Sequence, residues 1–411
     1  MKTFSGYEYL LIDACNQWGG DKWLFEERIQ WGMDNLAILE SFADTAETKP
    51  LYLKAVQAIR KAQQGIPTGH LVGLDAVCSG IQIMSVLSGC TSGATATGLV
   101  DPNVRSDAYT LTTKVMNDIL GGGLVVSRQD AKDSLMTSYY GSKAKPKEIF
   151  GEDTPELAAF YQAAQQVAPG AWELLQELLG SWKPWALSHQ WKLPDGFDAR
   201  IKVMAKQEVR IEVDELDHAT FTYEFYENQG SRTGLSNIAN VTHSVDGYVL
   251  RSMHRRCNYD LEMVTRALAL LETEMLFRKE ESTVQLDPQS KAGYYQAQYI
   301  RSTVADVVIL PYLNVENVMG LSTKHIESLA KIIQGMLAYK PFALVTVHDE
   351  FKALCGNLNH VRYQYKEILA ELADSFLLDD LLSQLHGRPG VFPKLNYQLG
   401  DLIRDSNYAL C

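Results

Sequence analysis

The chain has 411 residues and a formal net charge of −12, and its composition is 46% hydrophobic and 21% charged. These are ordinary globular values, so they exclude wholesale disorder. No run of about 18 apolar residues occurs, and the N-terminus lacks a charged lead followed by an apolar block, so we expect neither a membrane span nor secretion.

The first half of the chain predicts helices interrupted by one strand. The first 66 residues mix aromatic and charged side chains at helical spacing. The apolar run 70–77 predicts a buried strand that ends at Asp75. Residues 106–120 predict a helix closed by the glycines at 121–123, and a second helix is expected from Ser127 to Tyr140. Helical segments then lead to a turn at 194–196.

Two β-hairpins are expected in the second half. Residues 200–228 alternate with period two around a short polar turn, which predicts a hairpin. The rest reads as helical except for 342–354, an apolar strand that turns at His348 and Asp349 and returns as a second strand.

The six cysteines are scattered, without a Cys-x-x-Cys pair. This spacing argues against a zinc site and a disulfide framework, and it suits a reducing cytoplasm.

Asp75 and Asp349 each lie at the end of a short apolar strand. Two Mg²⁺ ions about 4 Å apart can stabilise the attacking and the leaving oxygen of a phosphoryl transfer. Magnesium prefers hard oxygen ligands and needs only one or two carboxylates besides the substrate phosphates. An isolated aspartate at a strand end is more often a turn residue, so the neighbouring motifs must decide between the two readings.

The predicted helix after the three glycines carries a basic pair and a tyrosine. Arg128, Lys132 and Tyr140 share one side, because a helix drifts only about 40° over four residues. Arg128 and Lys132 could bind a triphosphate together. Tyr140 lies about 12 Å beyond Lys132 along the helix axis, where a sugar and a base could reach. The alternative is an exposed basic pair with an aromatic anchor.

Together, these segments resemble the single-subunit DNA-directed RNA polymerases of phages and mitochondria. The likeness rests on three ordered motifs at residues 75–82, 128–141 and 347–350. Shorter stretches also resemble the family, at residues 6–16, 21–22, 27–29, 107–109, 194–197, 243–247, 395–397, 401–402 and 408–411. The resemblance implies an α+β fold that is mostly helical, with the palm and fingers of a right-hand polymerase.

The resemblance implies metal and phosphate ligands. Asp75 and Asp349, with the carbonyl of Ala76, would hold two Mg²⁺ ions. Arg128 and Lys132 would bind the triphosphate, and Lys132 would also protonate the leaving pyrophosphate.

The resemblance also implies contacts with the sugar and the base. Tyr140 would monitor the sugar and seat the incoming base pair, with Tyr109 on the neighbouring helix as a further substrate contact. His243 would contact the nascent pair near the ribose, and His348 would support the primer end beside Asp349.

Gly80 separates RNA synthesis from DNA synthesis. Family A DNA polymerases share much of this pattern but place a glutamate five residues after the metal-binding aspartate, where it blocks a 2′-hydroxyl. Here that position is Gly80, so we expect ribonucleotides. The alternatives are a family A-like DNA polymerase or primase, and a non-catalytic scaffold.

The resemblance divides the chain into four parts. We expect the first part of the palm at 1–110, fingers at 111–199, a specificity-loop-like hairpin at 200–230, and the second part of the palm at 231–411 with a helical insertion near 257–322.

The chain lacks counterparts of the family's N-terminal domain and thumb, so it resembles the catalytic larger subunit of a split, heterodimeric phage RNA polymerase. A second polypeptide would carry those elements. The other expected partners are the DNA template, the nascent RNA, ribonucleoside triphosphates, and a template-loading or promoter factor. The hairpin has a mixed charge, which predicts weak duplex promoter recognition. The expected location is the cytoplasm of an infected bacterial host.

Overall fold

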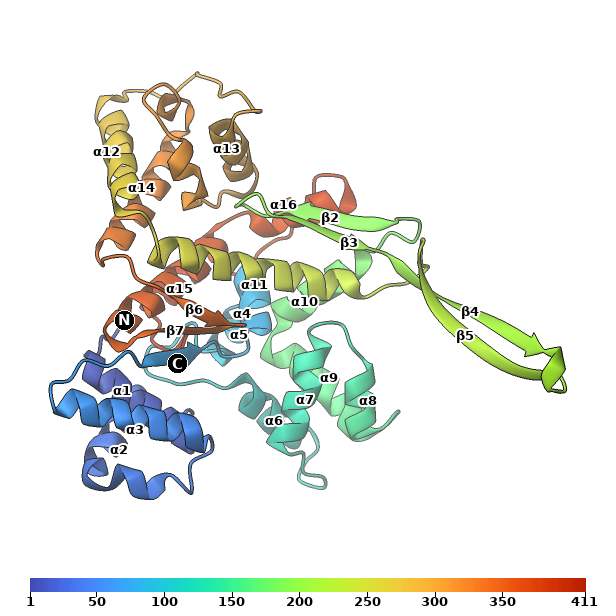
Figure 1. Ribbon diagram of the computed structural model, residues 1–411. Helices are drawn as coiled ribbons and strands as arrows, with labels where there is room; N and C mark the ends of the chain where they lie inside the picture. Colours follow the sequence, from blue (N-terminus) through green and yellow to red (C-terminus); the bar gives the residue numbers. More distant parts are fainter.

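The computed structural model describes residues 1–411, and it confirms the predicted mostly helical α+β class, with 57% of residues in helices and only small sheets. Most of the chain packs around one hydrophobic core of 73 buried residues, drawn from both ends of the sequence (Figure 1). The helices are α1 (Gly6–Cys15), α2 (Phe25–Asp34), α3 (Lys49–Gln63), α4 (Ser79–Ser88), α5 (Thr91–Ala96), α6 (Ala108–Ile119), α7 (Arg128–Ser138), α8 (Ala144–Phe150), α9 (Pro155–Val167), α10 (Pro169–Gly180), α11 (Ser236–Cys257), α12 (Leu261–Phe277), α13 (Lys291–Ser302), α14 (Thr323–Leu337), α15 (Leu358–Asp374), α16 (Leu377–His386) and α17 (Leu399–Asp405). None of them combines the length and the hydropathy that a membrane crossing requires.

The central sheet joins the two strands on which the sequence places aspartates. It has the order β1-β7-β6, with β1 at Leu71–Asp75, β6 at Val345–Val347 and β7 at Glu350–Leu354, all antiparallel. Both predicted apolar strands are therefore confirmed. Val72 and Leu74 of β1, and Phe351 and Ala353 of β7, face the core, as the two-residue period of a half-buried strand requires.

A second sheet was not predicted from the sequence. The segment before the turn at 194–196 was expected to be helical, but Ser188–Lys192 forms strand β2 and pairs with β3 (Asp198–Lys202). Its buried side chains are His189 and Trp191, which alternate with more exposed neighbours. Because His189 and Gln190 are polar, this alternation carries little apolar signal.

The long hairpin is confirmed with different bounds. Strands β4 (Met204–Val213) and β5 (Ala219–Asn228) pair only with each other and project from the body as a two-stranded ribbon (Figure 1). The prediction began at residue 200, but residues 200–202 belong to β3. Val203, which is buried, separates β3 from β4.

The expected helical insertion has a core of its own. Helices α12, α13 and α14 stand apart from the main body in Figure 1, and a second hydrophobic core of 17 buried residues lies among them. That core continues as far as Met336, beyond the expected end near residue 322.

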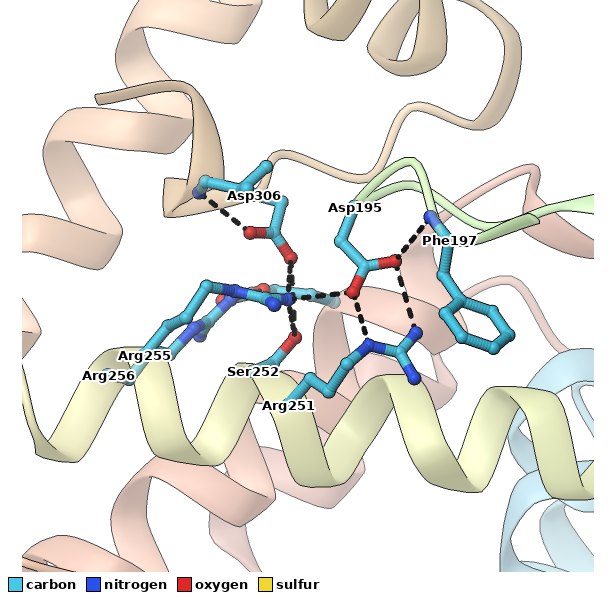
Figure 2. Close-up of polar contacts among 9 residues, drawn as sticks. Asp195, Phe197, Arg251, Ser252, Arg255, Arg256 and Asp306 are labelled. Carbon is cyan, nitrogen blue, oxygen red and sulfur yellow. Dashed lines mark hydrogen bonds and ion pairs between the residues drawn. The ribbon is translucent and has the colours of Figure 1, made fainter. Parts of the chain in front are cut away.

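A network of buried ions connects helix α11 to the insertion and to the β2–β3 turn (Figure 2). Asp195 of the turn accepts hydrogen bonds from Arg251 at 2.6 Å and from Arg255 at 3.2 Å. Arg255 also donates to Asp306 of the insertion at 2.9 Å. The side chains of Asp195 and Asp306 are only 3% and 4% exposed, so each carboxylate depends on its arginine for stability. The network therefore fixes the position of three segments at once.

We predict that Asp306→Ala destabilises the chain strongly. Removing one partner of a buried ion pair typically costs about 3–5 kcal/mol. We expect the variant to lose about 3 kcal/mol, the lower end of this range, because Arg255 keeps its ion pair with Asp195. Urea denaturation measures this free energy of unfolding. The control is Glu148→Ala, which removes an exposed pair with Lys145 and should leave the free energy of unfolding nearly unchanged. Equal losses in the two variants would contradict a structural role for the network.

Candidate nucleotidyl-transfer site

The strand register brings the two predicted metal-binding aspartates to one end of the central sheet. Asp75, the last residue of β1, lies opposite Glu350, the first residue of β7. The backbone N–H of Ala76 donates to the carbonyl oxygen of Asp349 at 3.3 Å. Asp75 and Asp349 are far apart in the sequence, yet their backbones are direct neighbours here.

The C-terminal residues complete this end of the sheet. Asp75 exchanges backbone hydrogen bonds with Cys411, at 3.3 and 3.0 Å, and Ala76 forms an antiparallel bridge with Leu410. Upstream in the same segment, Tyr408 stacks on Phe25 with 5.1 Å between the ring centroids. These contacts hold the backbone of Asp75 from the side opposite β7.

Gly73 makes room for Glu350. A Cβ atom at Gly73 would lie 2.0 Å from Oε1 of Glu350, so any side chain there would force the carboxylate to move. The same oxygen forms an ion pair with Lys352 at 2.9 Å. Glu350 therefore lies across β1, close to Asp75.

The carboxylates near the strand ends repel one another. Burial, and after it the charges of Asp349 and Glu350, raise the pKa of Asp75 to about 6, even though part of the Asp75 side chain meets solvent. Burial also raises the pKa of Asp246, on α11, to about 6, with Asp349 as the next cause. Two carboxylates whose pKa values are raised by burial and by neighbouring negative charge are a favourable setting for a cation.

Gly80 and Tyr140 meet at the start of α4. Cys78 has a left-handed backbone, with φ at 57°, and the chain turns there from β1 into the helix. A Cβ atom at Gly80 would lie 2.7 Å from the hydroxyl oxygen of Tyr140. The ring of Tyr140 also packs edge-on against His243, with 4.7 Å between centroids. The absence of a side chain at Gly80 is thus what allows the tyrosine hydroxyl to lie there.

Helix α7 is shorter than the sequence predicted. It was expected to reach Tyr140 but ends at Ser138, and the chain turns at Gly141, where φ is +88°. Tyr140 therefore lies beyond the last residue of the helix, and the predicted C-terminal end of the helix was wrong. Glycine in a left-handed conformation ends a helix at low cost.

Arg128 and Lys132 lie over the ring of Tyr109. Their cationic groups are 5.5 and 5.9 Å from its centroid, which is cation–π range. Arg128 also forms an ion pair with Asp107 at 2.6 Å, whereas Lys132 has no ion pair with a carboxylate. Both cations are half-buried, so they are held in place and still reachable.

Two cavities adjoin these residues. The first, of about 240 Å³, is lined by six of the predicted residues together with Asp246; the six are Gly80, Tyr109, Tyr140, His243, His348 and Asp349. The second, of about 960 Å³, is lined by Arg128 with three further basic side chains, Lys22, Arg105 and Lys114, against one acid, Asp107. The charge around this cavity is therefore positive, although the chain as a whole has a net charge of −12.

Two features of the site were not predicted from the sequence. Asp246 received no role, although it follows His243 by three residues and so shares a helical face with it. That spacing could have identified it. Lys22, Arg105 and Lys114 come from separate segments, and no pattern in the sequence brings them together.

The residues at the sheet end suit a divalent cation. Asp75 and Asp349 offer carboxylate oxygens and Ala76 offers a carbonyl, and these are the hard ligands that Mg²⁺ prefers. Another possible metal-binding group lies elsewhere, at the tip of the ribbon, where Glu212, Asp214 and His218 are close together but exposed.

Comparison with known families identifies the class of protein. The family model described as DNA-dependent RNA polymerase matches residues 2–145, a span that carries β1, α4, α6 and α7 and ends before His243 and Asp349. No curated protein matches the chain.

The match makes the chain an enzyme, a nucleotidyltransferase. Residues 2–145, about a third of the chain, are similar to the DNA-dependent RNA polymerases, and this supports the single-subunit type found in phages and mitochondria. Members of such polymerase families typically use divalent metal ions.

We predict that Asp75→Asn changes stability in a manner that depends on pH and on Mg²⁺. Because the pKa of Asp75 is raised from 3.8 to about 6 in the folded chain, ionisation destabilises the metal-free fold above pH 6 and not below pH 3.8. The variant should therefore melt higher than the wild type at pH 7.5, and this advantage should vanish near pH 4. Differential scanning calorimetry in EDTA measures both values.

The second half of this test adds Mg²⁺ at pH 7.5. The wild type should gain roughly 2 °C at ten times the dissociation constant, whereas Asp75→Asn should gain much less. Glu212→Gln, at the ribbon tip, serves as the control and should behave as the wild type. If the Mg²⁺-induced rise in melting temperature survives in Asp75→Asn and is lost in Glu212→Gln, the cation binds at the ribbon tip and not at Asp75.

Proposed function

We propose that this chain is the catalytic subunit of a phage DNA-directed RNA polymerase, which adds ribonucleotides to the 3′ end of RNA on a DNA template. One observation carries the proposal: the register of β1 on β7 places Asp75 beside Asp349, next to a cavity lined by Tyr140 and His243. The family match supports the reaction class.

In this proposal, Asp75 and Asp349 hold two Mg²⁺ ions, with the Ala76 carbonyl as an additional ligand. The ions supply electrostatic stabilisation of the attacking and leaving oxygens. The chain's own contribution is rigidity, because β7 and the C-terminal residues fix the Asp75 backbone from both sides. His348, with its left-handed backbone at φ 55°, makes the sharp turn before Asp349 and supports the primer end.

Arg128 and Lys132 bind the triphosphate. Tyr109 positions both cations through its ring face, and Lys132, which has no ion pair, is available to protonate the leaving pyrophosphate. The wider basic cavity lined by Lys22, Arg105 and Lys114 provides a favourable potential for the triphosphate beside Arg128.

Tyr140, Gly80 and His243 form the sugar side of the site. A glutamate at position 80 would collide with Tyr140 as well as with a 2′-hydroxyl, because even a Cβ atom there lies 2.7 Å from the tyrosine oxygen. The open Gly80 and the tyrosine hydroxyl thus favour a ribonucleotide over a deoxyribonucleotide.

The proposal keeps the division expected from the sequence. The palm comprises 1–110 and 231–411, the fingers 111–199 and the specificity-loop-like hairpin 200–230. A second polypeptide completes a heterodimer in the cytoplasm of the infected bacterium, and a loading or promoter factor brings the template. The net charge of −12 supports such a partner, since a DNA duplex needs positive charge that the chain as a whole does not provide.

Two other functions remain as alternatives. A family A-like DNA polymerase or primase would need to exclude the ribose hydroxyl, and Gly80 opposes that reading. A non-catalytic scaffold has no physical need for two adjoining aspartates, a half-buried basic pair and an open cavity.

We predict that Asp349→Ala abolishes RNA extension. The chain, with its partner polypeptide, is mixed with a primed single-stranded template, Mg²⁺ and ribonucleotides, and extension is followed on a gel. The variant should lose roughly a thousandfold in rate, because several kcal/mol of transition-state stabilisation disappear. Glu148→Ala, which removes an exposed carboxylate that does not line the cavity, should keep the full rate. Equal activity of the two variants would rule out the proposed metal site.

We predict that Tyr140→Phe relaxes the choice of sugar. The phenyl ring keeps the packing against His243 but removes the hydroxyl over Gly80. The ratio of kcat/KM for ATP to that for dATP should fall about tenfold or more, which corresponds to one lost hydrogen bond of about 1.4 kcal/mol. An unchanged ratio would remove Tyr140 from sugar selection.

A further inference from the structure

The β4–β5 ribbon has two faces of different chemistry. Directly paired residues of an antiparallel hairpin point to the same side, so Val209 with Tyr223 and Ile211 with Phe221 share one face. Phe225 joins them, with its ring 5.7 Å from that of Tyr223. We call these five residues the aromatic face.

The opposite face of the ribbon satisfies its own charges. Lys206 forms ion pairs with Glu224 at 2.7 Å and with Glu208 at 3.2 Å. Arg210 donates to the hydroxyl of Thr220 at 3.1 Å. This face therefore suits solvent and needs no further covering.

The aromatic face, by contrast, is covered by nothing in this chain. Phe221 and Tyr223 are 53% and 55% exposed, Val209 is 45% exposed, and no residue of β4 or β5 belongs to either hydrophobic core. A two-stranded hairpin by itself is marginally stable in water. A contiguous exposed patch of this kind, with bulky aromatic side chains, marks an interaction site.

The charge of the ribbon selects the kind of occupant. Residues 204–228 carry two basic side chains and seven acidic ones. Nucleic acid phosphates would be repelled. A second copy of the chain would bring the same acidic ribbon and its own net charge of −12.

We infer that the aromatic face docks onto another protein, whose contact surface combines an apolar groove with basic side chains around it. Aromatic anchors at the centre and charges at the rim are the usual anatomy of a protein interface. The ribbon would thus act as a protein-binding arm in place of the weak promoter contact expected from the sequence. The inference concerns binding, so it stands or falls independently of the proposed reaction.

Photocrosslinking in cells that naturally produce the chain identifies the occupant. The photoreactive residue p-benzoylphenylalanine replaces Tyr223 in one variant and Tyr226 in the other. Tyr226 is a matched control, because it is 66% exposed but pairs with Lys206 on the opposite face. We expect a crosslink to a different protein from position 223 and not from position 226. A crosslink to nucleic acid, a crosslink to a second copy, or the absence of any crosslink overturns the inference.

Titration of the captured protein, once purified, decides whether the contact is specific. Tyr223→Thr should weaken its binding by at least about 30-fold, the loss typical of an interface hot spot. Tyr226→Thr should change it by less than about threefold. Threonine keeps strand propensity in both variants, and hydrogen exchange of β4 and β5 checks that the ribbon still forms. Binding should also weaken as salt rises, because opposite charges surround the contact. Equal loss in both variants, or no salt dependence, contradicts the inference.

Discussion

The structure depends first on the pairing of β1 with β7. This register sets Asp75 opposite Glu350 and next to Asp349, and a shift by one residue would turn every side chain of β1 to the other face of the sheet. The buried Val72 and Leu74 oppose such a shift, because it would expose them. The same hydrophobic packing that folds the sheet therefore also fixes the position of both aspartates.

The surrounding elements reinforce this register. Gln82 of α4, which is fully buried, donates to the carbonyls of Thr97 and Ala409 and accepts from the hydroxyl of Tyr365. It thereby joins the helix after β1 to the C-terminal segment and to α15. A buried side-chain network with all its partners in place favours a single arrangement. The motif at residues 75–82 thus contributes to buried packing through Gln82 and to the candidate metal site through Asp75.

Helix α11 connects the site to the outer parts of the molecule. Its first half carries His243 and Asp246 to the smaller cavity, and its second half carries Arg251 and Arg255 to the buried ion network. The insertion, through Asp306, and the smaller cavity are therefore attached to the same helix. The sequence predicted the helical character of the insertion, but ion pairs between segments more than fifty residues apart leave no local pattern.

Sequence reasoning worked where a local pattern carries the structure. The apolar strands before Asp75 and Asp349 and the glycine-terminated helix after residue 106 follow directly from hydrophobic period and turn chemistry. It failed at β2, where polar residues conceal the alternation, and at the end of α7, where a glycine two residues beyond Tyr139 stops the helix early. The basic cavity could not be predicted from the sequence, because only tertiary packing brings its residues together.

Iron-directed cleavage tests the central claim, that the end of the β1–β7 pair is the metal site. Fe²⁺ substituted for Mg²⁺ produces hydroxyl radicals in the presence of ascorbate and peroxide, and these cut the backbone next to the bound ion. The account predicts fragments that end near Asp75 and near Asp349, suppressed by excess Mg²⁺. Cleavage confined to the ribbon tip around Glu212 and His218, or spread evenly along the chain, would contradict it.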